Sequence, residues 1–267
     1  MAERRRRGRG PFVSESPRWL SRVLHPFAAS MHHVDGVRAA DRRSCAVELT
    51  VPVDEVLALS RREGVSLTMY LTALYFESIR SAAGGLQRAQ TLSASVAVDL
   101  RRVFPSVSVR NFLAVVRVEH TYGLGSDEVG AVCRLLEQRF RARTTPAALT
   151  RKVRGFVAVE EIALVRVVPR RVKDPILRLI GWSIDRRASV SVSNLGRVVL
   201  PEPAEAHVGR LLFSVPAVRP QIAVVSHAGL LTITFTSPFV ESAHADAFAR
   251  ILAANGVEAV HTTPSPP

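Results

Sequence analysis

The stretch SVAVDLRRVFPS, residues 95–106, decides the fold, because a strand rich in valine and small residues ends within it at a charged turn. The alternation of apolar with small polar residues begins at Thr91 and stops at the charged residues Asp99 and Arg101. A second valine-rich stretch, FLAVVRVEH (112–120), follows after a polar link. Such alternation predicts two strands of one sheet, with polar side chains where the first strand ends.

Further strands and helices are expected on both sides of this pair. Alternating patterns predict strands over 44–52, 188–194 and 209–215, and a hairpin over 221–236 that turns near Ala228 and Gly229. Helical spacing predicts helices over 53–64, from the N-cap Ser66 through Ile79, from Ser126 through Phe140, and over 242–256. Helical tendency also runs from Pro146 to about Ile184, broken near Pro169 and Pro175. This order, without strict βαβ alternation, predicts an α/β or α+β domain with a mixed sheet flanked by helices.

Composition divides the chain into three parts. Residues 1–43 hold ten arginines against four acidic residues, in a chain whose net charge is +13. We expect a basic arm or linker there, one lobe over 44–260 and a flexible tail over 261–267. The run RRRRGRG could bind nucleic acid through its guanidinium groups, but such runs are more often solvated linkers, and that interpretation is favoured.

Cysteine usage and hydropathy bear on the cellular setting. Cys45 and Cys133 stand far apart without CxxC spacing, so neither a zinc site nor a disulfide framework is indicated. No apolar stretch reaches the roughly 20 residues that span a bilayer, and no secretory signal is visible. We therefore expect a cytoplasmic protein. The amphipathic stretch DPILRLIGWSIDRR (174–187) could lie on a membrane surface, but isoleucines facing a core are the favoured interpretation.

Several common enzyme signatures are absent from the sequence. GxSxG, GxxxxGK[ST] and HExxH do not occur, so hydrolase, nucleotide-binding and zinc-protease functions lack support. The glycines of YGLGSDEVG (122–130) have the spacing of a turn before a helix and not that of a dinucleotide site. We expect no metal site and no bound cofactor.

Three short motifs in order resemble a known family. They are Asp99-Leu100-Arg101 followed by FPS, then Arg110-Asn111-Phe112, and finally Ser193-Asn194-Leu195-Gly196. Together they resemble the second half of bacterial alcohol acetyltransferase-like proteins of the chloramphenicol acetyltransferase and condensation-domain superfamily. The resemblance covers nearly all of this chain. It departs at Ala97, where the family has proline, and at Asp99, where the family has asparagine.

The resemblance implies one lobe of a two-lobed acyltransferase, in which acceptor and acyl donor meet in a channel between lobes. It implies acyl-CoA as a co-substrate, a small alcohol-type acceptor and six candidate channel residues: Asp99, Arg101, Arg110, Asn111, Ser193 and Asn194. Ordinary structural roles are weighed beside this. Asn194 and Gly196 also fit a local turn, which we favour for Asn194, and Arg101 is as well suited to pairing with an acid as to contacting substrate.

The stretch MHHVDG (31–36) imitates the family's HHxxxDG box, whose second histidine is the general base. Here one residue separates His33 from Asp35, where that box has three. The resemblance also puts that box a whole lobe before the basic linker, whereas MHHVDG follows the linker. Removing two residues shortens an extended segment by roughly 6.5 Å, so Asp35 could not brace the loop in the same way. His33 therefore remains a candidate base that spacing and position both oppose.

Two functional hypotheses follow from different classes. In the first, the chain is the channel half of an acyl-CoA-dependent O-acyltransferase and requires a separate lobe that carries HHxxxDG, through a split gene, a frameshift or a misplaced start. In the second, it is a noncatalytic remnant or interaction module. Both predict that the chain binds the missing lobe or self-associates, and that it is inactive alone.

Overall fold

A computed structural model describes residues 31–38, 40–41, 43–86, 90–107, 111–161, 174–175, 178–179 and 187–262. The run RRRRGRG, the candidate Arg110 and most of the amphipathic stretch 174–187 lie outside the described residues. Among the described helices, none combines the length and apolarity needed to cross a membrane.

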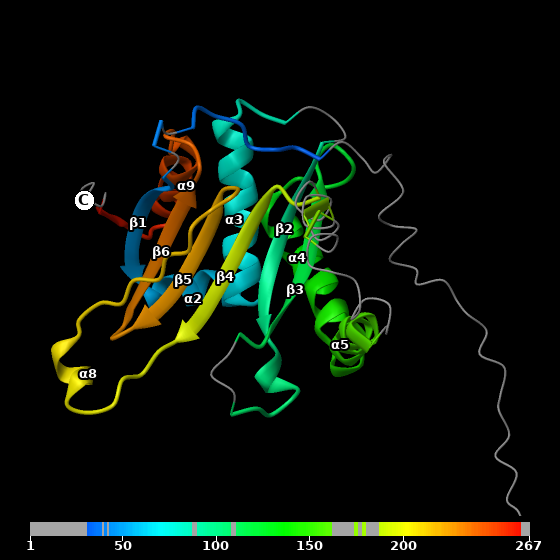
Figure 1. Ribbon diagram of the computed structural model, residues 1–267. Coiled ribbons are helices and arrows are strands. Elements are labelled where there is room, and N and C mark those ends of the chain that lie inside the picture. Colours follow the sequence, from blue (N-terminus) through cyan, green and yellow to red (C-terminus); the bar gives the residue numbers. More distant parts are fainter. Residues whose placement is uncertain are drawn as a thin grey trace, which may run out of the picture.

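One seven-stranded mixed sheet forms the centre of the molecule, with strands in the order β3-β2-β4-β5-β6-β1-β7 (Figure 1). The strands are β1 (Cys45–Pro52), β2 (Thr91–Asp99), β3 (Leu113–Thr121), β4 (Val190–Arg197), β5 (Gln221–His227), β6 (Leu230–Ser237) and β7 (Val260–Thr262). Strand β4 pairs in parallel with both β2 and β5, and every other pairing is antiparallel. The carboxyl ends of β2, β4 and β5 therefore meet at one end of the sheet.

The helices agree closely with the helical patterns of the sequence. They are α2 (Val53–Arg62), α3 (Leu67–Ala82), the short η1 (Leu100–Arg102), α4 (Val129–Thr144), α5 (Pro146–Glu161), α8 (Ala204–His207) and α9 (Ala243–Ala254). Helices α3, α4 and α9 cover one face of the sheet (Figure 1). The predicted α+β class, a mixed sheet flanked by helices, is thus confirmed.

The start of α3 shows how the sequence fixes a helix. As predicted, Ser66 is the N-cap, and its side chain accepts a hydrogen bond from the Met69 backbone N–H at 3.4 Å. The same hydroxyl donates to Glu137 of α4 at 2.6 Å, which ties the two helices together. Helix α3 is buried on most of its circumference, because α9 and α4 flank it while the sheet lies below.

Helix α4 begins later than the sequence predicted. Its N-cap is Glu128, and Ser126 stands two residues before that. The reason lies in Asp127, whose carboxylate accepts hydrogen bonds from the Gly123 backbone N–H at 2.9 Å and from the His120 ring at 3.0 Å. Those contacts hold residues 123–127 in a turn that delays the helix.

The strand predicted over 209–215 is wrong. Residues 198–220, here called the crossover loop, link β4 to β5, and 208–217 take no regular structure. Side chains hold this loop to the sheet: Arg210 contacts Glu48 and Thr50 of β1, and the Ala217 backbone N–H donates to Ser44. Polar contacts therefore hold this alternating stretch, and it joins no backbone ladder.

Candidate functional site

The motif Asp99-Leu100-Arg101 forms a capped turn at the carboxyl end of β2. The Asp99 carboxylate accepts a hydrogen bond from the Arg101 backbone N–H at 3.0 Å and lies 3.3 Å from the Arg101 guanidinium. Half of the Asp99 side chain is exposed, as is 37% of Arg101. Arg101 thus pairs with an acid, as one of the two sequence interpretations proposed, but the pair is solvent-accessible and not buried.

The second motif holds the first in place. The Leu100 backbone N–H donates to the Phe112 carbonyl at 3.1 Å, and the Arg101 guanidinium lies over the Phe112 ring at 6.0 Å. Leu100 fills a small apolar cluster with Ala114, Val116 and Leu149. Asn111, which precedes Phe112 in the sequence, is exposed. The structure therefore brings Asp99, Arg101 and the Phe112 neighbourhood together.

Asn194 bonds the local backbone as its sequence favoured, but within β4, where the pairing with β5 shifts register between Asn194 and Arg197, and not in a turn after the strand. Its side-chain oxygen accepts a hydrogen bond from the Gly196 backbone N–H at 2.8 Å, and Gly196 has a φ of +75°. The amide nitrogen of Asn194 donates to Thr68 in the first turn of α3 at 3.0 Å. Asn194 thereby fastens β4 to α3, a contact that no sequence pattern indicated. Its neighbour Ser193 is half-buried and pairs with Ala223 of β5.

These candidates share one end of the sheet. Strands β2 and β4 are in parallel register as far as Val96 and Val192, so the residues beyond emerge in the same direction. The end carries hydrogen-bond donors from Asn111, Arg101 and the Asn194 region, and a carboxylate that is already paired. Such groups can orient a substrate, but they do not include a histidine positioned as a general base.

His33 lies at the opposite end of the sheet. The neighbouring His32 backbone N–H donates to the Thr91 carbonyl at 2.9 Å, where β2 begins. Asp99 lies eight residues further along the same strand, about 26 Å away at the rise of a β-strand. Figure 1 shows the segment 31–38 crossing the sheet at the end away from the arrowheads of β2, β4 and β5. The structure does not bring His33 together with the other candidates.

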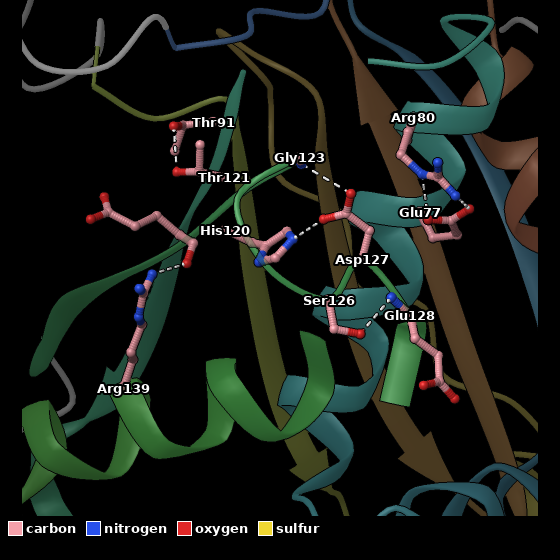
Figure 2. A network of polar contacts seen from close by, with 11 residues as sticks. Glu77, Arg80, Thr91, His120, Thr121, Gly123, Ser126, Asp127, Glu128 and Arg139 are labelled. Carbon is pink, nitrogen blue, oxygen red and sulfur yellow. Dashed lines mark hydrogen bonds and ion pairs between the residues drawn. The ribbon is translucent and has the colours of Figure 1, made fainter. Parts of the chain in front are cut away.

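A buried histidine–aspartate pair was missed by sequence reasoning. His120 on β3 donates through Nε2 to Asp127 (Figure 2). Its ring packs edge-on against that of Tyr122 at a centroid distance of 4.6 Å. Burial opposes the charge of Asp127, but hydrogen bonds from His120 and Gly123 outweigh it and lower the Asp127 pKa. The His120 side chain is only 3% exposed. It therefore has a structural role, because no substrate can reach it.

His227 joins the crossover loop to the end of β5. Its Nδ1 lies 3.1 Å from the Val198 carbonyl and its Nε2 lies 2.7 Å from the Val208 carbonyl. Carbonyl oxygens only accept, so both ring nitrogens must donate, and this requires the protonated imidazolium. The Val198 contact, then the Val208 contact and the nearby Glu205 carboxylate raise the His227 pKa against the effect of burial.

We predict that the crossover loop loosens as pH rises. The raised pKa means that the His227 contribution to stability is complete below its ordinary value of 6.5 and is lost as pH rises through the folded-state value. An NMR titration should give a His227 pKa above 6.5, with amide exchange at Gly209 and Arg210 accelerating across it beyond the intrinsic pH effect. His227→Gln should remove that excess. A His227 pKa at or below 6.5 would show that the two carbonyl contacts do not form.

Histidine, cysteine and acidic side chains are the usual metal ligands of proteins. No group of three or more histidine, cysteine, aspartate or glutamate side chains there has an arrangement that could hold a metal ion. Cys133 is buried, which raises its thiol pKa to about 12, and Cys45 is half-buried.

Comparisons with known proteins bear on the fold. No protein-family model and no curated protein matches the chain. Among solved structures, the nonribosomal peptide synthetase FmoA3 is similar over 90% of this chain and 25% of its own, with a TM-score of 0.54 and 17% identity. TRI3 trichothecene 15-O-acetyltransferase from Fusarium sporotrichioides is similar over 85% of this chain and 48% of its own, with a TM-score of 0.51 and 15% identity.

A third solved structure is similar over a comparable share of this chain. The epimerization domain from the third module of tyrocidine synthetase B matches 89% of this chain and 53% of its own, with a TM-score of 0.50 and 12% identity. The chain therefore spans about half or less of the length of these proteins. It shares its fold with a part of each of these proteins, which confirms the predicted fold.

Proposed function

We propose that this chain is the channel half of an O-acyltransferase that moves an acyl group from acyl-CoA to an alcohol. The observation that carries the proposal is the position of the three family motifs. In a fold shared with an acetyltransferase, Asp99, Arg101, Asn111 and Asn194 all lie at one end of the sheet. That end offers polar groups for positioning donor and acceptor.

The general base is proposed to come from a second lobe. A base must come within about 3 Å of the hydroxyl that it deprotonates. His33 lies across the length of the sheet from the motif residues, and His120 and His227 are committed to buried contacts. A lobe carrying HHxxxDG would complete the channel and hold the reactants in a geometry ready for attack.

We predict that the isolated chain does not catalyse acetyl transfer. Purified protein with acetyl-CoA and short-chain alcohols should form no ester above background, because the described residues supply neither a base beside the motif residues nor a second channel wall. Product measured by mass spectrometry and free CoA measured by thiol release give the rate. Saturable ester formation by the chain alone would overturn the need for a second lobe.

A noncatalytic interaction module is the second candidate. It is favoured because the motif side chains already form hydrogen bonds within the chain. Asp99 caps its own turn, and Asn194 bonds Gly196 and Thr68. Reading the DNA just upstream in all three frames separates the candidates. An HHxxxDG lobe there supports the enzyme, and its absence supports the module.

We also predict that the chain self-associates when it is alone. Apolar side chains exposed along β4 and the crossover loop are Leu195, Val199, Leu212, Val215 and Val218. Covering even about 400 Å² of apolar surface is worth on the order of 10 kcal/mol before association costs. Light scattering after size exclusion should give a mass above 29.2 kDa. A monodisperse monomer at micromolar concentration that binds no hydrophobic dye would contradict this.

A further inference from the structure

The segment 31–38 forms a strap over a cavity at the end of the sheet remote from the acyltransferase motifs. Its first part bonds to the start of β2 through the His32 backbone N–H. Its last part bonds to the chain after β6, where the Val240 backbone N–H donates to the Val37 carbonyl at 2.9 Å. The Arg38 guanidinium lies over the Phe239 ring at 5.6 Å. A cavity of about 300 Å³ lies between the strap, the end of α3 and the start of α9.

His244 lines this cavity from the first turn of α9. Its side chain is 5% exposed and packs against the rings of Tyr75 and Phe235, with centroid distances of 5.8 and 6.2 Å. None of the described residues hydrogen-bonds to it. Burial lowers its pKa to about 4, against a small opposing effect of Asp246, so the ring is neutral at pH 7. A buried neutral imidazole with no hydrogen-bond partner among the described residues offers a lone pair to a ligand.

The charge that faces the cavity is negative. Asp35 on the strap and Glu241 before α9 both line it, and both are exposed at its rim. His32 also lines it, and burial lowers its pKa despite the raising effect of Asp35. The strap closes tightly on Glu241, since a methyl group at Gly36 would come within 2.8 Å of the Glu241 carboxylate. The rim therefore presents two carboxylates beside neutral imidazoles.

The remaining lining of the cavity is apolar, and the electrostatic effects of the two helix ends that meet there nearly cancel. Ile79, Ala82 and Ala83 at the carboxyl end of α3 and Ala243 at the amino end of α9 form the inner wall. The positive end of α9 disfavours a cation, but the negative end of α3 beside it favours one by a similar amount. The two carboxylates then decide the preferred charge of a ligand.

We propose that this cavity binds a small organic cation, a primary ammonium group on a short apolar body. The ammonium would donate hydrogen bonds to the Asp35 and Glu241 carboxylates and to a ring nitrogen of His244, while the apolar body contacts Ile79 and Ala82. A carboxylate ligand would meet two like charges. A neutral alcohol of the same shape would leave both acids without a charged partner.

Benzylamine, benzyl alcohol and benzoate serve as matched probes, because they share one apolar body and differ in the polar group. Each is titrated into the ¹⁵N-labelled chain at pH 7 and followed by NMR shifts of Gly36, Ala83 and His244. Benzylamine should bind with a dissociation constant on the order of 1 mM. Benzyl alcohol and benzoate should bind at least about tenfold more weakly.

Variants identify the cavity as the binding site. Glu241→Gln combined with Asp35→Asn removes both charges with little change in shape, and should weaken benzylamine about tenfold or more. Glu258→Gln removes an exposed acid beyond the other end of α9 and should leave the affinity unchanged. The proposal is overturned by absence of benzylamine binding, by equal binding of benzyl alcohol or benzoate, or by equal loss in the control variant.

Discussion

Replacing Phe248 with alanine is expected to lower the free energy of unfolding by about 3–5 kcal/mol. Phe248 is fully buried on α9, and its ring packs edge-to-face on Phe235 of β6 at a centroid distance of 5.1 Å. Alanine would leave a cavity between the helix layer and the sheet, where neighbours fixed by β6 cannot collapse freely. Urea unfolding followed by circular dichroism measures the change.

Val240→Ala provides the control for this measurement. Val240 lies in the same part of the chain but is 55% exposed, so its loss should change stability by no more than about 0.5 kcal/mol. A loss below about 1 kcal/mol for Phe248→Ala would mean that α9 does not pack on the sheet as described. The cavity under the strap, which α9 helps to form, would then be in question as well.

Replacing His33 with alanine should leave acetyl transfer by a reconstituted two-lobe protein within a few-fold of the parent. Replacing the second histidine of the partner lobe's HHxxxDG should lower kcat by about 10² to 10⁴, the usual cost of losing a general base. The contrast follows from geometry, since the strap is tied to Thr91 at the far end of β2 from Asp99. Steady-state kinetics with acetyl-CoA and an alcohol acceptor give both values.

His261→Ala is the matched control, because His261 is an exposed histidine on β7 that the motifs do not involve. It should behave like His33→Ala. A hundredfold fall in kcat for His33→Ala alone, with circular dichroism unchanged, would identify His33 on the strap as the general base. It would contradict the placing of the acyl-transfer channel at the end of the sheet that carries the motifs.

Most of the fold could be predicted because its signals are local. Period-two alternation marks β1, β2 and β3, and Gly229 marks the hairpin turn because glycine reaches positive φ without steric cost, here 78°. Ala228 also has a positive φ, 47°, which its residue type did not indicate. The strand expected over 209–215 does not form, because alternation of apolar residues does not by itself supply a partner strand for backbone pairing. Helix α4 started late because Asp127 is engaged by His120, seven residues back along the chain.

The candidate site was only partly predictable. The motifs identified the residues at the ends of β2 and β4, and the local contact of Asn194 with Gly196 could be predicted because it spans two residues, although it lies in an irregular part of β4 and not in a turn. The contact between Asn194 and Thr68 joins residues 126 positions apart, and His227 reaches Val198 across 29. Such partners depend on topology, which no spacing rule in one sequence encodes.

We propose that this chain supplies the channel and that another lobe supplies the base. The most direct test is ester formation from acetyl-CoA by the chain mixed or co-expressed with an HHxxxDG lobe encoded next to it, compared with each part alone. We expect a stable complex, saturable ester formation only when both parts are present, and a fall in kcat of about 10²- to 10⁴-fold when the lobe's second histidine is replaced. A stable complex that forms no ester, or a chain that forms ester by itself, would contradict it.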